Sequence, residues 1–362
     1  MDRLNHRAIV RMNCVRHITA CLLFRAKSRL AFIPQVMPIF SAGQTTQLFA
    51  PTLKAFCFLI LAFVIGCKHT SPMVAVIPRT TGMALWEPEH AGAAAAAIKH
   101  GMKIYWNAPT REDDVQGQIA LIEKVIDKRY AGLILSPDQT LALMTLVRSA
   151  LSKGIPTVIV GSALPLEPGG KLSYVLSDDE DAGRMAADRI GTIMHGKGTV
   201  AVIGINPDIS GVLDRVRSFE STLDTRYPNI RITEKRLGSF NVPYEQQITE
   251  EVLTADPNLG AILAVTADAT RGAYSALSEL HKAGTVKLVG CDQDLLLPLM
   301  TGEMDSVIAE DTYQMGYQAI ALLAQEQQGK TAASLTKLKP QLVTKENLNS
   351  PEIRRMLGLV ER

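Results

Sequence analysis

Two successive rounds of short apolar runs that alternate with longer helical patterns are the feature that most constrains the fold of this 362-residue chain. The first round has predicted strands at 73–78, 102–107, 131–136 and 155–161, with helices at 89–101, 111–130 and 139–154. The second has predicted strands at 198–204, 230–237, 260–265, 286–290 and 305–309, with helices between them. Short apolar strands that alternate with helices are typical of parallel sheets covered on both faces. The sequence therefore predicts an α/β fold of two doubly wound parallel-sheet lobes, with a ligand cleft at the carboxyl ends of the strands.

The predicted strand ends lack the short motifs that mark nucleotide binding or common hydrolytic chemistry. The loop after the first strand, RTTGMALW, has one glycine where a dinucleotide site needs Gly-x-Gly-x-x-Gly, and the chain has no Walker phosphate loop. It also has no Gly-x-Ser-x-Gly and no His-Glu-x-x-His. The histidines beyond residue 66 are scattered, without metal-ligand spacing. We therefore expect no enzyme, no cofactor and no metal site.

An apolar segment that ends at a cysteine precedes the first predicted strand. Residues 55–66 are apolar or small, and these 12 residues are too few for a membrane-spanning helix, which needs roughly 20. Their length is that of a signal-peptide core. The sequence Val-Ile-Gly-Cys at 64–67 resembles the lipobox of bacterial lipoproteins, which implies a diacylglyceryl group on Cys67. A short buried strand or helix with an incidental cysteine is the alternative.

The lipobox divides the chain into a leader, 1–66, and a mature protein that begins with a tether, 67–71. A start at Met37 would give a leader of ordinary length. The leader contains eight Lys and Arg residues and one acid, so the remaining chain has 30 basic and 35 acidic residues. This acidic balance gives no indication of nucleic-acid binding.

Eight segments of the mature chain resemble, in order and spacing, the periplasmic sugar-binding proteins of the ribose-binding type, relatives of lactose-repressor-like effector domains. The segments are VIPRTTGMALWEPEHAGA (76–93), YAGLILSPDQ (130–139), GIPTVIVGSAL (154–164), VLSDDEDAG (175–183), LTADPNLGAILA (253–264), KLVGCDQD (287–294), IAEDTYQMGY (308–317) and LVTKENLNSPE (342–352). The resemblance implies the type I periplasmic binding protein fold with a three-crossover hinge. The first lobe would be 72–177 with 311–340, and the second 178–310 with 341–362. The crossovers would lie near Ser177-Asp178, Glu310-Asp311 and Pro340.

The resemblance also implies a sugar held between aromatic side chains of the two lobes, with its hydroxyls bound by polar groups. Trp86 matches the aromatic residue after the first strand, and Phe240 matches that of the second lobe. Trp86 could instead pack on its own lobe at the start of a helix, and Phe240 could be an ordinary apolar loop residue. Asp292 matches the carboxylate that accepts hydrogen bonds from sugar hydroxyls, and the N-cap of a helix at 293–301 is the alternative role for it.

Further polar residues at strand ends are expected to contact the ligand. Glu310 stands where the family usually has a glutamine, and could bond a ligand hydroxyl or the hinge backbone. Arg79 could contact the ligand or pair with Asp292 or Glu310. The remaining candidates are short side chains, of which the last two could simply form a turn: Ser162, Thr266, Asn206 and Asp208.

Two departures from the ribose pattern leave the ligand open. The pair at 161–162 is Gly-Ser where many relatives have Asp-Arg, and Leu213 replaces an arginine that contacts sugar. Arg215 matches a basic position that is usually structural. The resemblance therefore implies a sugar or sugar-like polyol but not which one. An amino sugar is compatible, because Asp292 and Glu310 add negative charge.

The sequence as a whole predicts a lipid-anchored solute-binding protein of an ABC importer, located in the periplasm or otherwise outside the cytoplasm. Its closed, ligand-bound form would be presented to permease subunits. A ligand-sensing subunit that feeds a signalling partner is the alternative. A lactose-repressor-like transcription regulator would need an N-terminal helix-turn-helix, where 1–66 instead have a signal-peptide core and lipobox. A glycosidase built on Asp292 and Glu310 lacks a site for an activated water.

Overall fold

The computed structural model describes residues 71–359, which belong to one compact unit. The predicted leader, the lipobox with Cys67 and most of the tether lie outside the described residues. Within residues 71–359, no helix has both the length and the apolar character needed to cross a membrane.

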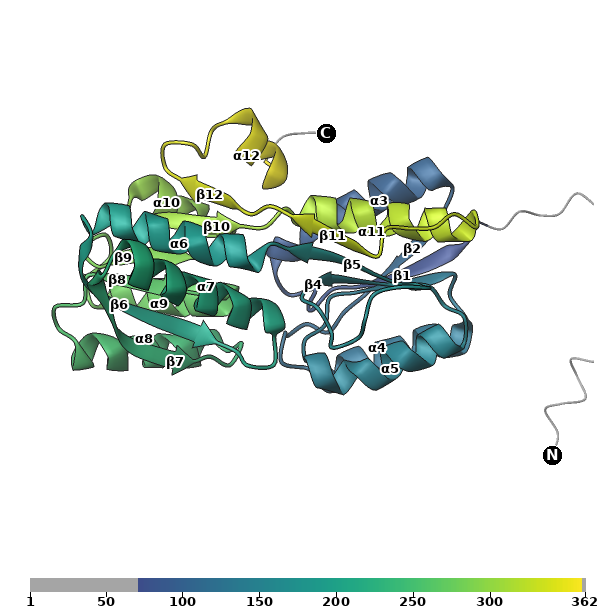
Figure 1. Ribbon diagram of the computed structural model, residues 1–362, viewed down its shortest axis with the longest axis horizontal. Helices are drawn as coiled ribbons and strands as arrows, with labels where there is room; N and C mark the ends of the chain where they lie inside the picture. The colour runs from purple at the N-terminus through teal and green to yellow at the C-terminus, as the bar shows by residue number, and fades with distance from the viewer. Residues whose placement is uncertain (1–70, 360–362) are drawn as a thin grey trace, which may run out of the picture. The chain divides into compact units, whose positions relative to one another are not determined.

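The first sheet has six strands, all parallel, in the order β11-β5-β4-β3-β1-β2. The strands are β1 (Met73–Ile77), β2 (Lys103–Trp106), β3 (Gly132–Leu135), β4 (Thr157–Gly161), β5 (Leu172–Ser177) and β11 (Leu335–Leu338). Helices α3 (Glu87–His100) and α11 (Thr312–Gln327) pack on one face, and α4 (Val115–Lys128) and α5 (Thr140–Ser152) pack on the other. We call this sheet and its helices the first lobe (Figure 1).

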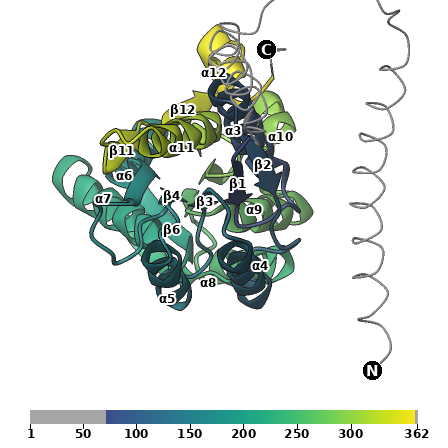
Figure 2. The same ribbon diagram turned by 90° about the vertical axis from the view of Figure 1, so that its right-hand side faces the viewer.

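The second sheet has the order β12-β10-β9-β8-β6-β7, and only the edge strand β12 is antiparallel to its neighbour. The strands are β6 (Lys197–Ile205), β7 (Asn229–Leu237), β8 (Ala261–Ala264), β9 (Lys287–Gly290), β10 (Ser306–Ala309) and β12 (Gln341–Thr344). Helices α6 (Asp179–Ile193) and α7 (Ser210–Arg226) cover one face. Helices α8 (Val242–Ala255) and α9 (Ala267–Glu279) cover the other, together with α10 (Leu296–Thr301) and α12 (Pro351–Met356). We call this group the second lobe (Figure 2).

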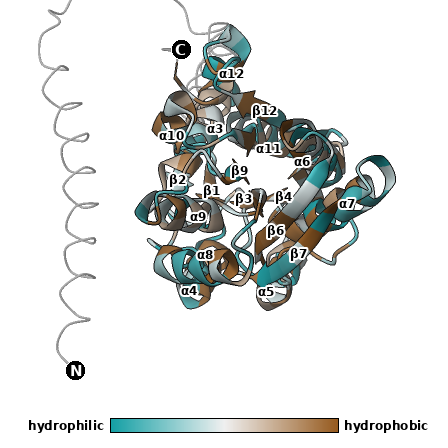
Figure 3. Ribbon diagram, turned by 90° about the vertical axis from the view of Figure 1, so that its left-hand side faces the viewer, coloured by the Kyte–Doolittle hydropathy of each residue, from teal (hydrophilic) through white to brown (hydrophobic). Residues whose placement is uncertain are grey.

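The hydrophobic core of each lobe lies on both faces of its sheet. Every residue of β3, β4 and β8 is buried, as expected for central strands of a sheet with helices on two sides. Figure 3 shows the same pattern, with brown gathered on the strands and teal on the outward faces of the helices. Burial on both faces explains why these strands read as continuous apolar runs in the sequence.

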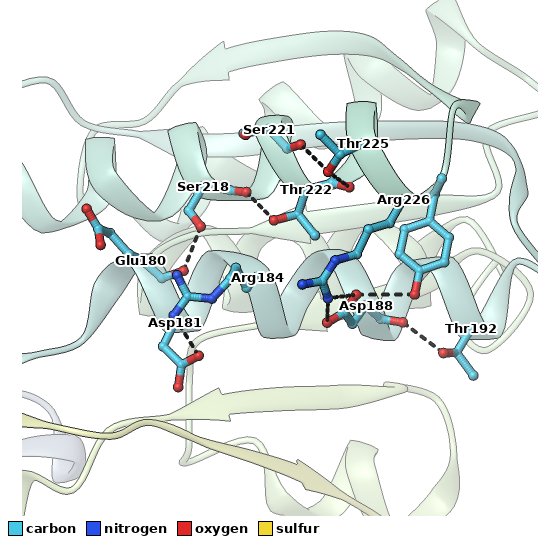
Figure 4. Close-up of polar contacts among 11 residues, drawn as sticks. Glu180, Asp181, Arg184, Asp188, Thr192, Ser218, Ser221, Thr222, Thr225 and Arg226 are labelled. Carbon is cyan, nitrogen blue, oxygen red and sulfur yellow. Dashed lines mark hydrogen bonds and ion pairs between the residues drawn. The ribbon is translucent and has the colours of Figure 1, made fainter.

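Helices α6 and α7 pack side by side and are joined by polar contacts at their outer edge (Figure 4). Arg226 Nη1 lies 2.7 Å from Asp188 Oδ2, and the Ser218 hydroxyl donates to the Glu180 carbonyl at 2.6 Å. Arg226 and Asp188 are both more than one third exposed. Such an exposed ion pair contributes little to stability.

The chain passes between the two lobes three times, from β5 to α6, from β10 to α11 and from β11 to β12. Asp178 and Asp311 cap the helices that follow the first two crossings, by accepting hydrogen bonds from Asp181 N (3.1 Å) and Gln314 N (2.9 Å). Asp178 N also donates to Leu338 O at 2.8 Å, which ties the first crossing to the third. The predicted fold class, two doubly wound lobes joined by three crossovers, is confirmed. The residue limits of the lobes stay a prediction.

Three of the observed strands were not among those predicted, namely β5, β11 and β12. The last two have four residues each and lie at sheet edges, and β11 alternates exposed and half-buried positions. A short, half-exposed edge strand has no continuous apolar run to reveal it. The predicted helices differ from α3, α4 and α5 by a few residues at their ends, where caps such as Asp114 set the boundary.

Candidate ligand-binding site

A cavity of about 60 Å³ lies between the lobes at the carboxyl ends of their strands. Its walls come from the loop after β1, the ends of β4 and β9, the first turns of α7 and α9, and the second crossing. This is the position that the fold favours for a ligand. Five of the nine predicted ligand residues line it: Arg79, Trp86, Ser162, Thr266 and Glu310.

The loop after β1 places Trp86 and Arg79 against each other in the cavity wall. A short helical turn at Ala84–Trp86 leads directly into α3, and the Trp86 side chain becomes buried. Its indole N–H donates to Glu112 Oε1 at 3.1 Å. The Arg79 guanidinium lies over the ring, with its carbon 5.7 Å from the ring centroid. The aromatic surface predicted to stack on a sugar therefore already contacts a cation from the chain itself.

Hydrogen bonds direct the Arg79 guanidinium along the end of the first sheet. Its Nε donates to Pro137 O at 3.2 Å, and its Nη2 donates to the Ser162 hydroxyl at 3.0 Å. Both hydrogen bonds of Arg79 therefore go to groups of the first lobe, and neither goes to Asp292 or Glu310, the alternative partners. Ser162 and Arg79 thus form one polar wall of the cavity.

Arg215 occupies the second-lobe side of the cavity as a buried guanidinium with five hydrogen bonds. Its Nη2 lies 2.6 Å from both Asp179 Oδ1 and Glu310 Oε1, and its Nε also donates to Asp179. Its Nη1 donates to Val265 O at 2.9 Å and to Cys291 Sγ at 3.1 Å. Asp179 follows the first crossing and Glu310 precedes the second, so Arg215 connects the cavity to the hinge. Burial raises the pKa of Asp179 to about 6 even though Arg215 opposes the shift.

Asp292 lies behind the cavity wall, at the end of β9, and is completely buried. Arg271 Nε donates a short hydrogen bond to it, and Asp294 N donates to Asp292 Oδ1 at 2.9 Å. Arg271 Nη2 also lies 2.7 Å from Asp294 Oδ2. In this arrangement Asp292 orders the turn after β9. Its contact with a ligand stays a prediction.

The other three predicted residues lie outside the cavity lining. Asn206 Oδ1 accepts from Asp208 N at 2.9 Å, which closes the turn before α7. The Asp208 carbonyl accepts from Thr140 N at 3.3 Å and so joins this turn to the start of α5. Phe240, with φ of 52°, packs half-buried against the second-lobe core. Their ligand roles stay predictions as well.

Three buried carboxyl groups near the cleft were missed by the sequence analysis. Glu112, Asp138 and Asp268 are at most 7% exposed. Burial raises the pKa of Asp138 to about 8 and that of Asp268 to about 7, and it also raises the pKa of Glu112. Asp138 directly follows the run LILSP at the end of β3, which was a usable signal. Asp268 follows the predicted strand 260–265 in a similar way, whereas Glu112 carries no comparable signal. Of the three, Glu112 lines the cavity.

The lobes touch each other directly around the cavity. Leu85 N donates to Asp294 Oδ2 at 3.2 Å, and the Ser210 hydroxyl donates to Ala163 O at 3.1 Å. A larger opening of about 880 Å³ adjoins the cavity and shares Leu85 and Gln293 as walls. The described arrangement is therefore a closed one, with a wide space beside the narrow cavity. Among residues 71–359, no group of histidine, cysteine and acidic side chains is placed to hold a metal ion.

Two α/β lobes, three crossings and a cleft at the strand ends define the class of two-lobed solute-binding folds. Residues 74–331 match the family model described as periplasmic binding protein domain, and the chain belongs to this family. The match spans most of the chain that the structure describes.

Curated relatives and solved structures agree with that family. The chain is 28% identical over 206 residues to the xylitol-binding protein of Mycolicibacterium smegmatis, a match that covers 56% of this chain and only 56% of that protein. It is 23% identical to the D-ribose/D-allose-binding protein of Pseudomonas aeruginosa, over 68% of this chain and 79% of that protein. A carbohydrate transporter solute-binding protein from Agrobacterium radiobacter, solved with D-arabinose, superposes with a TM-score of 0.74 at 23% identity, covering 80% of this chain and 100% of the other.

Proposed function

We propose that this protein is the solute-binding component of an ABC importer, acts outside the cytoplasm, and binds a sugar or sugar-like polyol in the cleft. The observation that carries the proposal is the cavity between the lobes, which joins one aromatic face, Trp86, to polar groups of both lobes. Polyol recognition needs such a combination of an aromatic surface and convergent hydrogen-bonding groups. The named ligands of the relatives, xylitol, ribose and allose, support the same class.

Binding requires the lobes to open. A cavity of about 60 Å³ is well below the roughly 300–1,000 Å³ typical of small-molecule sites. The three crossings are the segments about which the lobes would rotate. A ligand that contacts both lobes would then stabilise the closed form through contacts that the open form cannot make. The permease would recognise the closed form. Opening, ligand binding and closure would thus serve transport and not catalysis.

The anchor belongs to the same proposal. A diacylglyceryl group on Cys67 would hold the protein at the membrane surface through residues 67–71. Each buried CH₂ adds about 0.8 kcal/mol, and a single acyl chain binds only marginally, so at least two chains are needed for stable anchoring.

Ligand screening by thermal shift tests the proposal. A ligand at 100 times its Kd raises stability by about 2.7 kcal/mol. We expect at least one compound among xylitol, D-ribose, D-allose and D-arabinose to raise Tm. If no sugar or polyol of a broad panel raises Tm or gives heat on titration, the proposed function is wrong.

The two tryptophans of the chain allow the bound ligand to be located. Trp86 lines the cavity, whereas Trp106 stacks on His90 with ring centroids 4.6 Å apart. In Trp106→Phe, Trp86 is the sole tryptophan, and we expect its emission to change when ligand binds. In Trp86→Phe, emission from Trp106 should not respond. A response that persists only in Trp86→Phe would place the ligand elsewhere.

A further inference from the structure

Gln293, in the loop after β9, lies at the border between the narrow cavity and the wider opening beside it. Its side chain lines both spaces, as does that of Leu85 from the opposite lobe. Leu85 N donates to Asp294 Oδ2 at 3.2 Å, so the first lobe directly contacts the loop that carries Gln293. Gln293 is therefore a second-lobe residue of the cleft that the closed first lobe covers.

One end of the Gln293 side-chain amide is bonded and the other end is not. Its Oε1 accepts a hydrogen bond from Glu310 N at 3.2 Å, and this bond determines which end of the amide is the nitrogen. Its Nε2 is buried and has no hydrogen-bond partner among residues 71–359. The residue as a whole is 6% exposed. Among the described side chains that line the narrow cavity, Gln293 is the one with a buried polar atom left without a partner.

We propose that Gln293 donates a hydrogen bond from Nε2 to a hydroxyl oxygen of the ligand, and that this contact makes closure of the lobes depend on an occupied cleft. The inference rests on the proposed function, because it assigns one ligand contact in the same cleft. A hydroxyl oxygen has two acceptor lone pairs, so a sugar or polyol offers several acceptors to an amide N–H.

The dependence of closure on ligand follows from the cost of burying an unbonded donor. When the lobes are apart, the first lobe no longer covers the loop after β9, and water can bond Nε2. Closure around an empty cleft removes that water and leaves Nε2 without an acceptor, which is unfavourable. Closure around a hydroxyl replaces the lost bond. The ligand thus favours the closed form through a contact that the open form does not make.

The bonded end of Gln293 connects this contact to the second crossing between the lobes. Glu310, whose backbone N–H donates to Gln293 Oε1, lies between β10 and α11. Its carboxylate lies 2.6 Å from the guanidinium of Arg215. A ligand hydroxyl that holds Nε2 in place would also keep Oε1 bonded to the crossing in the closed form.

Calorimetry with deoxy analogues tests the ligand contact on the full chain. The parent compound is the tightest binder among xylitol, D-ribose, D-allose and D-arabinose, and it is titrated beside its monodeoxy analogues. Gln293→Met keeps the length of the side chain and removes the amide, so the parent compound should bind it roughly 2- to 12-fold more weakly. One deoxy analogue should bind the unmodified protein more weakly by at least that factor, because Nε2 is then buried without a partner. The same analogue should lose no affinity relative to the parent compound in Gln293→Met.

Small-angle X-ray scattering of the ligand-free proteins tests the link to closure. Gln293→Met has no amide donor to bury, so its closed form should be more populated without ligand. We expect a smaller radius of gyration than that of the unmodified protein, and a smaller change when the parent compound is added. Gln325→Met, at an exposed position of α11, is the matched control and should behave as the unmodified protein does in both experiments. Should Gln293→Met fail to fold, Gln293→Leu gives the same comparison.

The outcomes separate this inference from the proposed function. If Gln293→Met binds the parent compound as tightly as the unmodified protein does, the inference is wrong and the proposed function stands. The same holds if every monodeoxy analogue loses affinity by the same factor in both proteins, because Gln293 then contacts no ligand hydroxyl. An unchanged radius of gyration of ligand-free Gln293→Met also overturns the inference. If no compound of the wider sugar panel binds, both proposals fail.

Discussion

Arg215 and Glu310 form an ion pair of 2.6 Å that links the wall of the ligand cavity to the second crossing between the lobes. The same guanidinium nitrogen lies 2.6 Å from Asp179, just after the first crossing. One buried side chain therefore holds two of the three hinge segments. A ligand contact that moves Arg215 would therefore also move or break its ion pairs with Asp179 and Glu310 at the hinge.

Removing this guanidinium should destabilise the protein in a pH-dependent way. Arg215→Met leaves Asp179 and Glu310 without their partner, and breaking a buried pair from one side costs about 3–5 kcal/mol. The loss should be smaller at pH 5 than at pH 7.5, because an unpaired buried carboxyl can be protonated at the lower pH. Urea unfolding at both pH values measures it. Arg217→Met, an exposed neighbour on α7, should cost no more than about 1 kcal/mol. If both variants lose the same free energy of unfolding, Arg215 does not stabilise the two crossings as described.

The pH profile of the free protein should reveal the buried carboxyl of Asp138. Its pKa of about 8 lies above the unfolded value of about 3.9, so the folded state binds the proton more tightly. Stability from this group is therefore full below about pH 4 and is lost as pH rises towards 8. Asp138→Asn should reduce the pH dependence of the free energy of unfolding between about pH 4 and pH 8. Relative to the unmodified protein, the variant should gain stability as the pH rises to 8. Asp113→Asn is the matched control, since Arg111 lowers the pKa of that exposed neighbour. A profile that is unchanged by Asp138→Asn would contradict the assignment.

A hydrogen bond across the cleft should contribute to ligand affinity. Asp294→Ala removes the acceptor for Leu85 N, which joins the lobes in the closed arrangement. A hydrogen bond of this kind contributes about 0.5–1.5 kcal/mol, so Kd should rise roughly 2- to 12-fold. Calorimetry with the best ligand of the screen measures the change. Asp127→Ala, on the exposed face of α4, should bind as the unmodified protein does. Tighter binding in Asp294→Ala would mean that this contact opposes closure.

Lipid attachment should depend on one thiol. Cys67→Ser keeps a residue of similar size but removes the sulfur that would take the diacylglyceryl group. We expect unprocessed precursor or released protein in cell fractionation, and no incorporation of labelled fatty acid. Cys57→Ser, within the apolar segment before the lipobox, is the control and should still be labelled. Labelling that continues in Cys67→Ser would contradict the anchor.

The predicted site residues show where sequence reasoning reaches its limit. Arg79 and Ser162 directly follow predicted strands, and Trp86 lies at the end of the loop after the first strand. All three line the cavity because the carboxyl ends of parallel strands share one edge of the sheet. Arg215 was treated as structural, although it lines the same cavity. Its position one turn inside a helix carries no sequence signal for the cleft. The sequence also did not show that Arg271, from the neighbouring helix α9, pairs with Asp292, whose ligand contact stays a prediction.

The sequence by itself determined the two-lobed α/β architecture, because strands buried on both faces must be apolar throughout and helices must carry an apolar stripe. Only the tertiary structure decided which charges in the cleft are compensated. Ion pairs such as Arg215 with Glu310 join residues that are far apart in the chain, and no local sequence pattern predicts that two such residues lie close together in space. The same holds for Asp138 and Asp268, whose burial depends on what packs around them. Charge compensation is a property of three-dimensional proximity, whereas strand and helix patterns are a property of neighbouring residues.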